Sequence, residues 1–180
     1  MKKKTLFRII IIIMLFFVTG CGNKFTMDGK EVNFDKQYKD RYITYNYPGD
    51  FKEVIGEAKY PMDMQRTYEY YKDDKKTFVL KVEEYSLGLS FAKMEEDAKA
   101  IENNPNYKNV EQTTIKANGK NLVRYAFRTN DEFGDNTVHF VYYAGYSYMG
   151  IYEYIKIYLI NIEGKEGFEE AFLSSFKVNR

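Results

Sequence analysis

The chain has 180 residues with 27 basic and 26 acidic side chains, and its formal net charge is +1. Its one cysteine, Cys21, and its one histidine, His139, exclude an intramolecular disulfide, a cysteine-based zinc cage and any metal site that needs two histidines. Four basic residues and no acidic ones lie within residues 1–20. The remainder is therefore acidic, which argues against a general DNA- or RNA-binding protein.

The chain begins with a charged and then apolar leader. Three lysines at positions 2–4 precede an apolar run over residues 9–18. A helix needs about 20 apolar residues to cross a bilayer, so this shorter run has the order of a secretory signal peptide. We predict that residues 1–20 form a signal peptide. A buried N-terminal helix and a short membrane span are the alternatives.

The sequence Val18-Thr19-Gly20-Cys21 follows the apolar run and resembles the bacterial lipobox. In proteins with that motif the chain is cleaved before the cysteine, here between Gly20 and Cys21, and the thiolate takes a diacylglyceryl group. Two acyl chains hold a protein stably on a membrane, whereas one chain holds it weakly. The resemblance thus implies a lipid anchor at Cys21 on the outer face of the cell membrane. A free cysteine near an ordinary cleavage site is the alternative.

Residues 21–37 mix glycine, asparagine, lysine and aspartate with isolated apolar residues. We predict that they form a tether, with one short strand near 30–34, and that residues 38–180 form a globular domain close to the lipid surface. In this domain, β-branched and aromatic residues in alternation predict strands at 42–47, 66–71 and 77–85.

Two later segments have helical spacing. The segment 90–104, with Ser90 as the N-cap and Pro105 after its end, has one apolar stripe made of Phe91, Met94, Ala98 and Ile101. A second stripe near the C-terminus predicts a helix on Phe168, Ala171, Phe172 and Phe176, with solvent-facing Glu166, Glu169 and Glu170.

Between the two helices the sequence predicts four strands. Asn118-Gly119 separates the alternating segments 111–116 and 120–128, and this dipeptide is the strongest short-range cue for a hairpin. Two more strands are expected at 137–146 and 149–162. Strands joined by tight turns pair antiparallel, so the expected class is α+β, with an antiparallel β-sheet flanked by two helices.

Three segments resemble the Mog1/PsbP family, whose members are α/β/α sandwiches built on an antiparallel sheet. They are the entry strand ITYNYPGDF at 43–51, the hairpin IKANGKNLVRY at 115–125 and the closing FLSSFK at 172–177. Family members are photosystem assembly proteins, regulators of small GTPases or exported proteins. The resemblance therefore implies a shape and no particular reaction or catalytic residue.

Few residues offer catalytic chemistry. His139 lies in an apolar strand segment, where a histidine is more often packed than a general base. The acidic groups Glu83-Glu84 and Glu95-Glu96-Asp97 are more simply explained as solvated charge. No cofactor motif is found, so we expect no cofactor.

An acidic loop joins two of the predicted strands and holds Asp131, Glu132 and Asp135. Oxygen ligands of this kind suit Ca²⁺, which makes these three residues a weak calcium candidate. The spacing does not match an EF-hand, and ordinary turn chemistry explains the loop equally well.

The chain is rich in tyrosine, with 18 Tyr and no Trp. On the last long strand, isoleucines and a leucine share one face, which we expect to meet a helix. Tyr152, Tyr154 and Tyr158 share the other face with Lys156 and form a half-exposed candidate partner surface. Glu153 is expected at the exposed end of the strand. The codon bias of an AT-rich genome is the alternative explanation for so much tyrosine.

These observations predict a membrane-anchored extracytoplasmic lipoprotein, with a Gram-positive origin favoured. Its domain would act as a non-enzymatic binding or assembly module, with the membrane and an envelope protein as partners and no nucleic acid. Two alternatives stay open. One is an envelope hydrolase that uses a carboxylate or His139, and the other is a phage- or plasmid-encoded protective lipoprotein.

Overall fold

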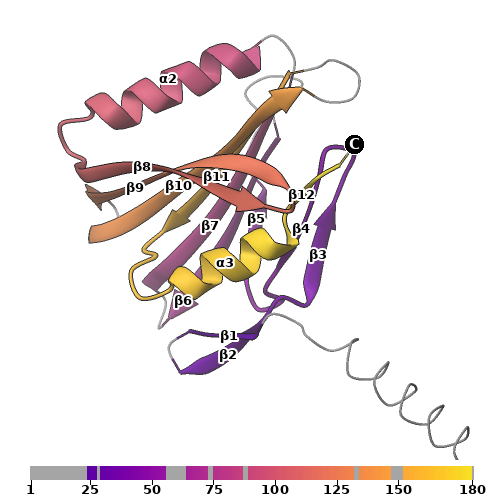
Figure 1. The fold of residues 1–180 in the computed structure, drawn as a ribbon. Helices are drawn as coiled ribbons and strands as arrows, with labels where there is room; N and C mark the ends of the chain where they lie inside the picture. Colours follow the sequence, from indigo (N-terminus) through magenta and orange to yellow (C-terminus); the bar gives the residue numbers. More distant parts are fainter. Residues whose placement is uncertain are drawn as a thin grey trace, which may run out of the picture.

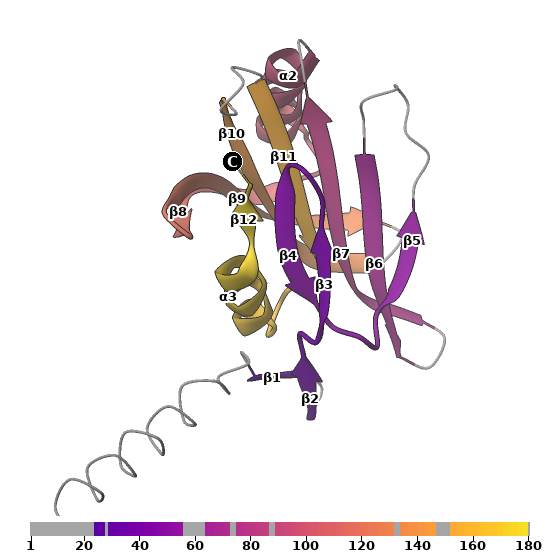
Figure 2. The same ribbon diagram turned by 90° about the vertical axis from the view of Figure 1, so that its right-hand side faces the viewer.

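The computed structural model describes residues 24–27, 29–55, 64–72, 75–86, 89–131, 134–146 and 152–179. In these ranges the chain forms two helices, α2 and α3, which cover opposite faces of one central sheet (Figures 1 and 2). The strand pairs of the described residues are all antiparallel. The expected α+β class, an antiparallel sheet flanked by two helices, is confirmed. Neither described helix is long and apolar enough to cross a membrane.

The central sheet has seven strands in the order β5-β6-β7-β11-β10-β9-β8. Sequence neighbours pair within β5-β6-β7 and within β8-β9-β10-β11, and the two runs meet where β11 pairs with β7, which leaves β8 at the far edge. Each strand predicted in this part of the chain is present, with ends shifted by a few residues. The bounds are Lys52–Ile55 (β5), Met64–Lys72 (β6), Lys75–Ser86 (β7), Lys108–Ala117 (β8), Lys120–Asp131 (β9), Gly134–Tyr146 (β10) and Tyr152–Ile160 (β11).

The predicted hairpin at Asn118-Gly119 joins β8 to β9. Both turn residues have positive φ, 46° at Asn118 and 77° at Gly119, as a two-residue hairpin turn that follows the twist of the strands requires. The Asn118 amide also donates to the carbonyl oxygens of Ser174 at 2.9 Å and Phe176 at 2.6 Å. The turn therefore closes the C-terminal end of α3, which lies more than fifty residues further along the chain.

A smaller sheet and a separate hairpin lie on the α3 side of the molecule (Figure 2). The hairpin pairs β1 with β2, and the small sheet has the order β12-β4-β3. Most of these strands are too short to give a clear pattern in the sequence. Their bounds are Lys24–Met27 (β1), Lys30–Asn33 (β2), Lys36–Lys39 (β3), Ile43–Tyr47 (β4) and Lys177–Val178 (β12).

The tether expected over residues 21–37 is wrong from residue 24 onward, although the short strand expected near 30–34 is present as β2. Met27 and Val32 are 2% and 4% exposed and belong to the main core. Phe25 packs edge-on against Phe168 of α3, with ring centroids 6.1 Å apart. The isolated apolar residues of this segment are thus anchored by contacts with distant parts of the chain, and the folded unit includes them. Residues 21–23 lie outside the described ranges.

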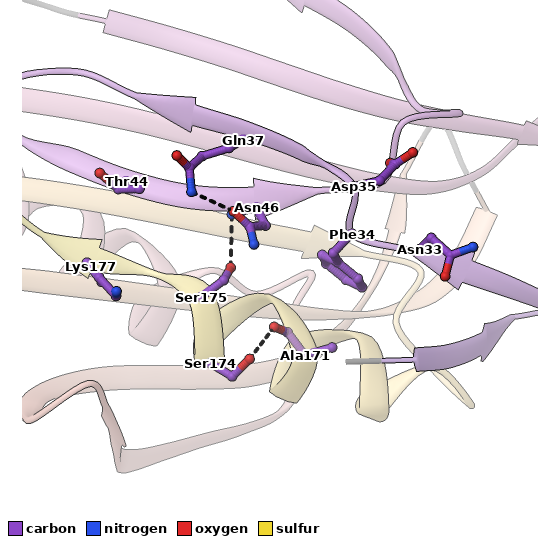
Figure 3. Close-up of a pocket in the computed structure, with 10 residues that line it drawn as sticks. All are labelled: Asn33, Phe34, Asp35, Gln37, Thr44, Asn46, Ala171, Ser174, Ser175 and Lys177. Atoms are coloured by element: carbon purple, nitrogen blue, oxygen red, sulfur yellow. Dashed lines mark hydrogen bonds between the residues drawn. The ribbon is translucent and has the colours of Figure 1, made fainter. Parts of the chain in front are cut away.

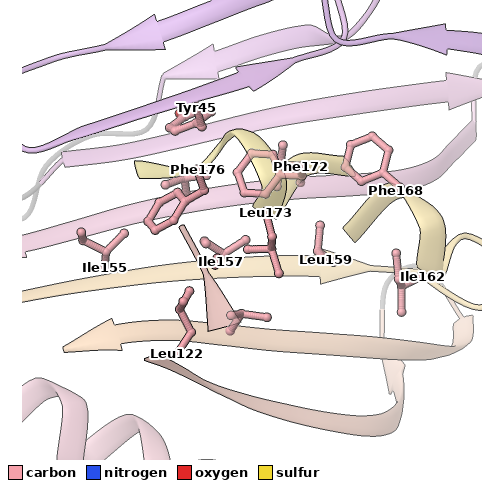
Figure 4. Packing of buried hydrophobic residues seen from close by; sticks show 14 of the residues in the cluster. Tyr45, Leu122, Ile155, Ile157, Leu159, Ile162, Phe168, Phe172, Leu173 and Phe176 are labelled. Carbon is pink, nitrogen blue, oxygen red and sulfur yellow. The ribbon is translucent and has the colours of Figure 1, made fainter. Parts of the chain in front are cut away.

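The main core lies between α3 (Glu166–Ser175), the small sheet and the central sheet (Figure 4). Phe168 and Phe172 are fully buried and Phe176 is 1% exposed. They face the aliphatic side of β11, where Ile157 and Leu159 are also fully buried. Full burial of one such side chain contributes about 1.5–3 kcal/mol, so the predicted apolar stripe of this helix is confirmed as a main anchor of the fold.

A second core lies between α2 (Leu89–Asn103) and the tyrosine-rich face of the sheet. Ile101 is buried there, and Met94 and Ala98 pack partly against it. Phe91, which the sequence placed on the same stripe, is instead 52% exposed. Asp97 of the same helix faces the sheet as well, and its carboxylate reaches Lys156 of β11 at 3.1 Å.

Candidate functional site

A polar groove lies between α3 and the outer face of the small sheet (Figure 3). The alternation along β4 produces it, because Ile43 and Tyr45 point into the core while Thr44 and Asn46 point outward. The groove has a volume of 630 Å³, within the range of small-molecule sites. It is lined by Asn33, Phe34, Asp35, Gln37, Thr44, Asn46, Ala171, Ser174, Ser175 and Lys177.

Hydrogen bonds fix the side chains at the centre of the groove (Figure 3). The Gln37 amide nitrogen donates to the Asn46 side-chain oxygen at 3.1 Å, and the Asn46 backbone N–H donates to the Ser175 hydroxyl at 2.9 Å. Ser174 donates to the Ala171 carbonyl oxygen at 2.7 Å. Of the elements that line the groove, β3, β4 and α3 are thereby joined by polar contacts, and the two amides have defined orientations.

Two charged residues of opposite sign, Asp35 and Lys177, line opposite ends of the groove (Figure 3). Asp35 accepts a hydrogen bond from the Gly49 backbone N–H at 2.7 Å. A Cβ at position 49 would lie 2.5 Å from that carboxylate oxygen, so a larger residue there would push the Asp35 carboxylate aside. The two charges offset each other, and the rest of the polar lining is amide and hydroxyl.

The sequence did not indicate this groove, because its lining comes from segments far apart in the chain. Residues 33–35 were assigned to a tether, and β12 is two residues long. The one available signal was the polar pair Thr44 and Asn46, which alternates with buried residues within a strand that was correctly predicted.

The tyrosine face of β11 is not the partner surface that the sequence suggested. Tyr154 is fully buried beneath α2, and its hydroxyl donates to Asp97 at 3.0 Å. Tyr158 is partly buried, and the side chain of Tyr152 lies outside the described part of the chain. Glu153, expected at an exposed strand end, is 3% exposed. The alternation of side chains along β11 identified the two faces of this strand, but it could not show that a helix covers each of them.

Lys156 is the centre of a buried charge cluster on this face. It is 4% exposed, and its ammonium lies 2.5 Å from Glu83 and 3.1 Å from Asp97. The rings of Tyr85 and Tyr158 lie 4.7 and 5.7 Å from the same nitrogen. Glu83 and Asp97 are therefore structural partners of a buried cation, which corrects their assignment as solvated charge.

The charges in this cluster stabilise one another. Burial alone would raise the pKa of Glu83, but the ammonium groups of Lys156 and Lys81 outweigh it, so the pKa lies below its ordinary value. Burial would likewise lower the pKa of Lys156, but Tyr158 and the carboxylates of Glu83 and Asp97 hold it above its ordinary value. Glu83 and Lys156 are therefore ionised at neutral pH, and the contact between Lys156 and Asp97 joins α2 to the sheet.

His139 lies on the opposite face of the sheet, beneath α3. It is 8% exposed, and its Nδ1 lies 2.5 Å from the carboxylate of Glu169. Glu169 itself is 4% exposed and also lies 3.6 Å from the Arg124 guanidinium, which corrects its assignment to the solvent side of the helix. This position gives no support to the use of His139 as a general base, because the imidazole is buried beneath a helix and leaves little access for a substrate.

The structure gives little support for the remaining predicted sites. Asp135 is exposed and lies 3.4 Å from Arg128, while Glu132 and the side chain of Asp131 lie outside the described ranges. Among the described residues, no three His, Cys, Asp or Glu side chains are grouped so that they could hold a metal ion. Gly20 and Cys21 also lie outside the described ranges, so the lipid anchor stays a prediction.

Neither a protein-family profile nor a curated protein sequence matches this chain. Several solved structures match its fold, including CyanoP and LpqN. CyanoP, the cyanobacterial PsbP of Synechocystis sp. PCC 6803, has a TM-score of 0.54 at 12% identity, covering 79% of this chain and 91% of that one. LpqN, which is involved in cell envelope biogenesis of Mycobacterium tuberculosis, has a TM-score of 0.50 at 9% identity, covering 73% and 93%. At these identities the similarity shows a PsbP-like fold alone.

Proposed function

We propose that this chain is an exported lipoprotein whose PsbP-like domain acts as a non-enzymatic binding module at the outer face of the cell membrane. The observation that carries the proposal is the short interval between the lipobox cysteine and the folded domain. Two residues separate Cys21 from β1, which begins at Lys24. An extended chain rises at most about 3.6 Å per residue, so the first residue of the domain would lie within about 11 Å of the Cys21 Cα atom.

The β1–β2 hairpin supports this proposal because it is firmly held at the start of the domain. Met27 is 2% exposed, and Phe25 contacts the ring of Phe168. An anchor at Cys21 would therefore be attached next to a segment that is packed on the core of the domain. The domain would be held close to the headgroups with few orientations available to it.

The binding role rests on the groove between α3 and β4. It is concave, it is polar, and its side chains are already fixed by hydrogen bonds such as that between Gln37 and Asn46. Preformed concave sites with a few fixed polar groups are where proteins bind small ligands. His139, one of the groups that the hydrolase alternative could use, is bound to Glu169 on another part of the sheet.

Replacement of Cys21 by serine tests the anchor. The variant should be found as the uncleaved precursor or as a soluble form, and not as a cleaved form in the membrane fraction, since a hydroxyl does not replace the thiolate as the lipid acceptor. Thr19→Ala is the matched control, because it keeps a small residue before the cleavage site and should give the cleaved form in the membrane fraction. A Cys21→Ser variant that is cleaved and membrane-associated like the wild type would contradict the proposal.

A further inference from the structure

We propose that the groove between α3 and β4 binds a neutral saccharide. The inference rests on the proposed function, because glycans are abundant on the outer side of a cell membrane. Six of the ten lining residues carry an amide or a hydroxyl, and these groups both donate and accept hydrogen bonds, as sugar hydroxyls do. The six are Asn33, Gln37, Thr44, Asn46, Ser174 and Ser175.

The bond between Gln37 and Asn46 prepares a specific recognition element. It uses the amide nitrogen of Gln37 and the side-chain oxygen of Asn46. The Gln37 side-chain oxygen and the Asn46 amide nitrogen are left as an acceptor and a donor on neighbouring strands, which pair Gln37 with Asn46 in register. Two adjacent hydroxyls on a sugar ring present the complementary donor and acceptor, so the pair can bind a vicinal diol with two hydrogen bonds.

The rest of the lining suits the same class of ligand. Phe34 and Ala171 form an apolar patch in the groove, and the Phe34 ring is held by Phe168, 5.0 Å away between centroids. A sugar ring has an apolar C–H face that can pack on such a surface while its hydroxyls reach the amides. The charges of Asp35 and Lys177 offset each other, whereas an anionic polymer would need an excess of cations.

Two sources could supply this chemistry, a cell-wall glycan and the headgroup of a glycolipid. Both can be distinguished with the intact chain in phosphatidylglycerol nanodiscs, using saturation-transfer NMR with a panel of neutral oligosaccharides that includes the N-acetylglucosamine tetramer. Adding diglucosyl diacylglycerol to the nanodiscs should lower the apparent affinity of the free sugar if the headgroup is the natural ligand. It should leave the affinity unchanged if the ligand is a wall glycan.

Gln37→Ala and Asn46→Ala should each weaken saccharide binding roughly fivefold to tenfold, as expected for the loss of one hydrogen bond. Gln112→Ala is the matched control, because Gln112 is an exposed amide on β8, outside the groove, and should bind like the wild type. Gln37 is itself exposed, so its variant should keep the melting temperature of the wild type.

The inference would be overturned by the absence of saturation transfer from every oligosaccharide in the panel, or by an equal loss in Gln112→Ala. Membrane fractionation tests the anchor and saccharide binding tests the groove. Either proposal can therefore fail while the other stands.

Discussion

Replacement of Lys156 by methionine should destabilise the protein by about 3 kcal/mol at pH 7. Methionine keeps the length and packing of the side chain but removes the ammonium that lies 2.5 Å from Glu83 and 3.1 Å from Asp97. Removing one partner of a buried ion pair costs roughly 3–5 kcal/mol because the other charge stays buried and uncompensated. The lower end of that range applies here, since Lys81 still faces Glu83 at 2.6 Å and Lys93 still faces Asp97 at 2.9 Å.

The size of this loss should depend on pH. In the folded protein the pKa of Glu83 lies below its ordinary value of 4.5, so its contribution to stability is complete above that pH and is lost as the pH falls through the lowered pKa. The pKa of Lys156 lies above its ordinary value of 10.5, so its contribution is complete below that pH and is lost as the pH rises through the raised pKa. The difference in free energy of unfolding between the wild type and Lys156→Met should therefore be largest between about pH 5 and pH 10 and should become smaller in acid.

Urea denaturation at pH 7 and pH 4 measures both effects, and thermal unfolding should show a Tm lowered by about 6–12 °C for a domain of this size. Lys116→Met, a change at an exposed lysine of β8, is the matched control and should alter stability by less than about 0.5 kcal/mol. The double variant Lys156→Met with Glu83→Gln should recover part of the loss, because the orphaned carboxylate is gone. A loss below about 1 kcal/mol, or one equal at both pH values, would refute the reasoning.

Two other substitutions test separate features. Asn118→Gly keeps a residue suited to positive φ but removes the amide that donates to Ser174 and Phe176. Urea denaturation should show that its free energy of unfolding is lower than that of the wild type by about 1 kcal/mol. Asn118→Ala should lower the free energy of unfolding further, because alanine is strained in this turn. Glu153→Gln should raise the stability by about 1 kcal/mol at pH 7, because burial raises the pKa of Glu153 and one of its carboxylate oxygens has no partner. That gain should disappear in thermal melts below pH 4.5, where the acid is protonated in both states, and an equal gain at every pH would contradict this explanation.

The parts of the fold that sequence reasoning recovered are those with local causes. The β8–β9 hairpin follows from Asn118-Gly119, whose backbone preference needs no tertiary contact. The helix α3 follows from a regular stripe of phenylalanine, which any apolar surface would bury. Long strands such as β10 were predicted for the same reason, because the strand pattern in their sequence repeats too many times to arise by chance.

The errors concern features that depend on distant partners. β1 is stabilised by β2 and by Phe168, which lies more than 140 residues away, so nothing in its four residues distinguishes it from a linker. Glu83 looked solvated because its partner Lys156 is on a strand that only the topology brings alongside. The candidate groove was missed for the same reason, as its lining is assembled from both ends of the described chain.

Each helix is held to the sheet by apolar packing and by a buried charged group, and the two kinds of contact limit sequence change in different ways. Where Phe168 and Phe172 fill the core beneath α3, a substitution is acceptable if it conserves apolar volume. Where Asp97 of α2 meets Lys156, or Glu169 of α3 meets His139, a change of charge at one position requires a compensating change at the other. Homologous sequences should thus show independent variation at the apolar positions and paired variation at the charged ones.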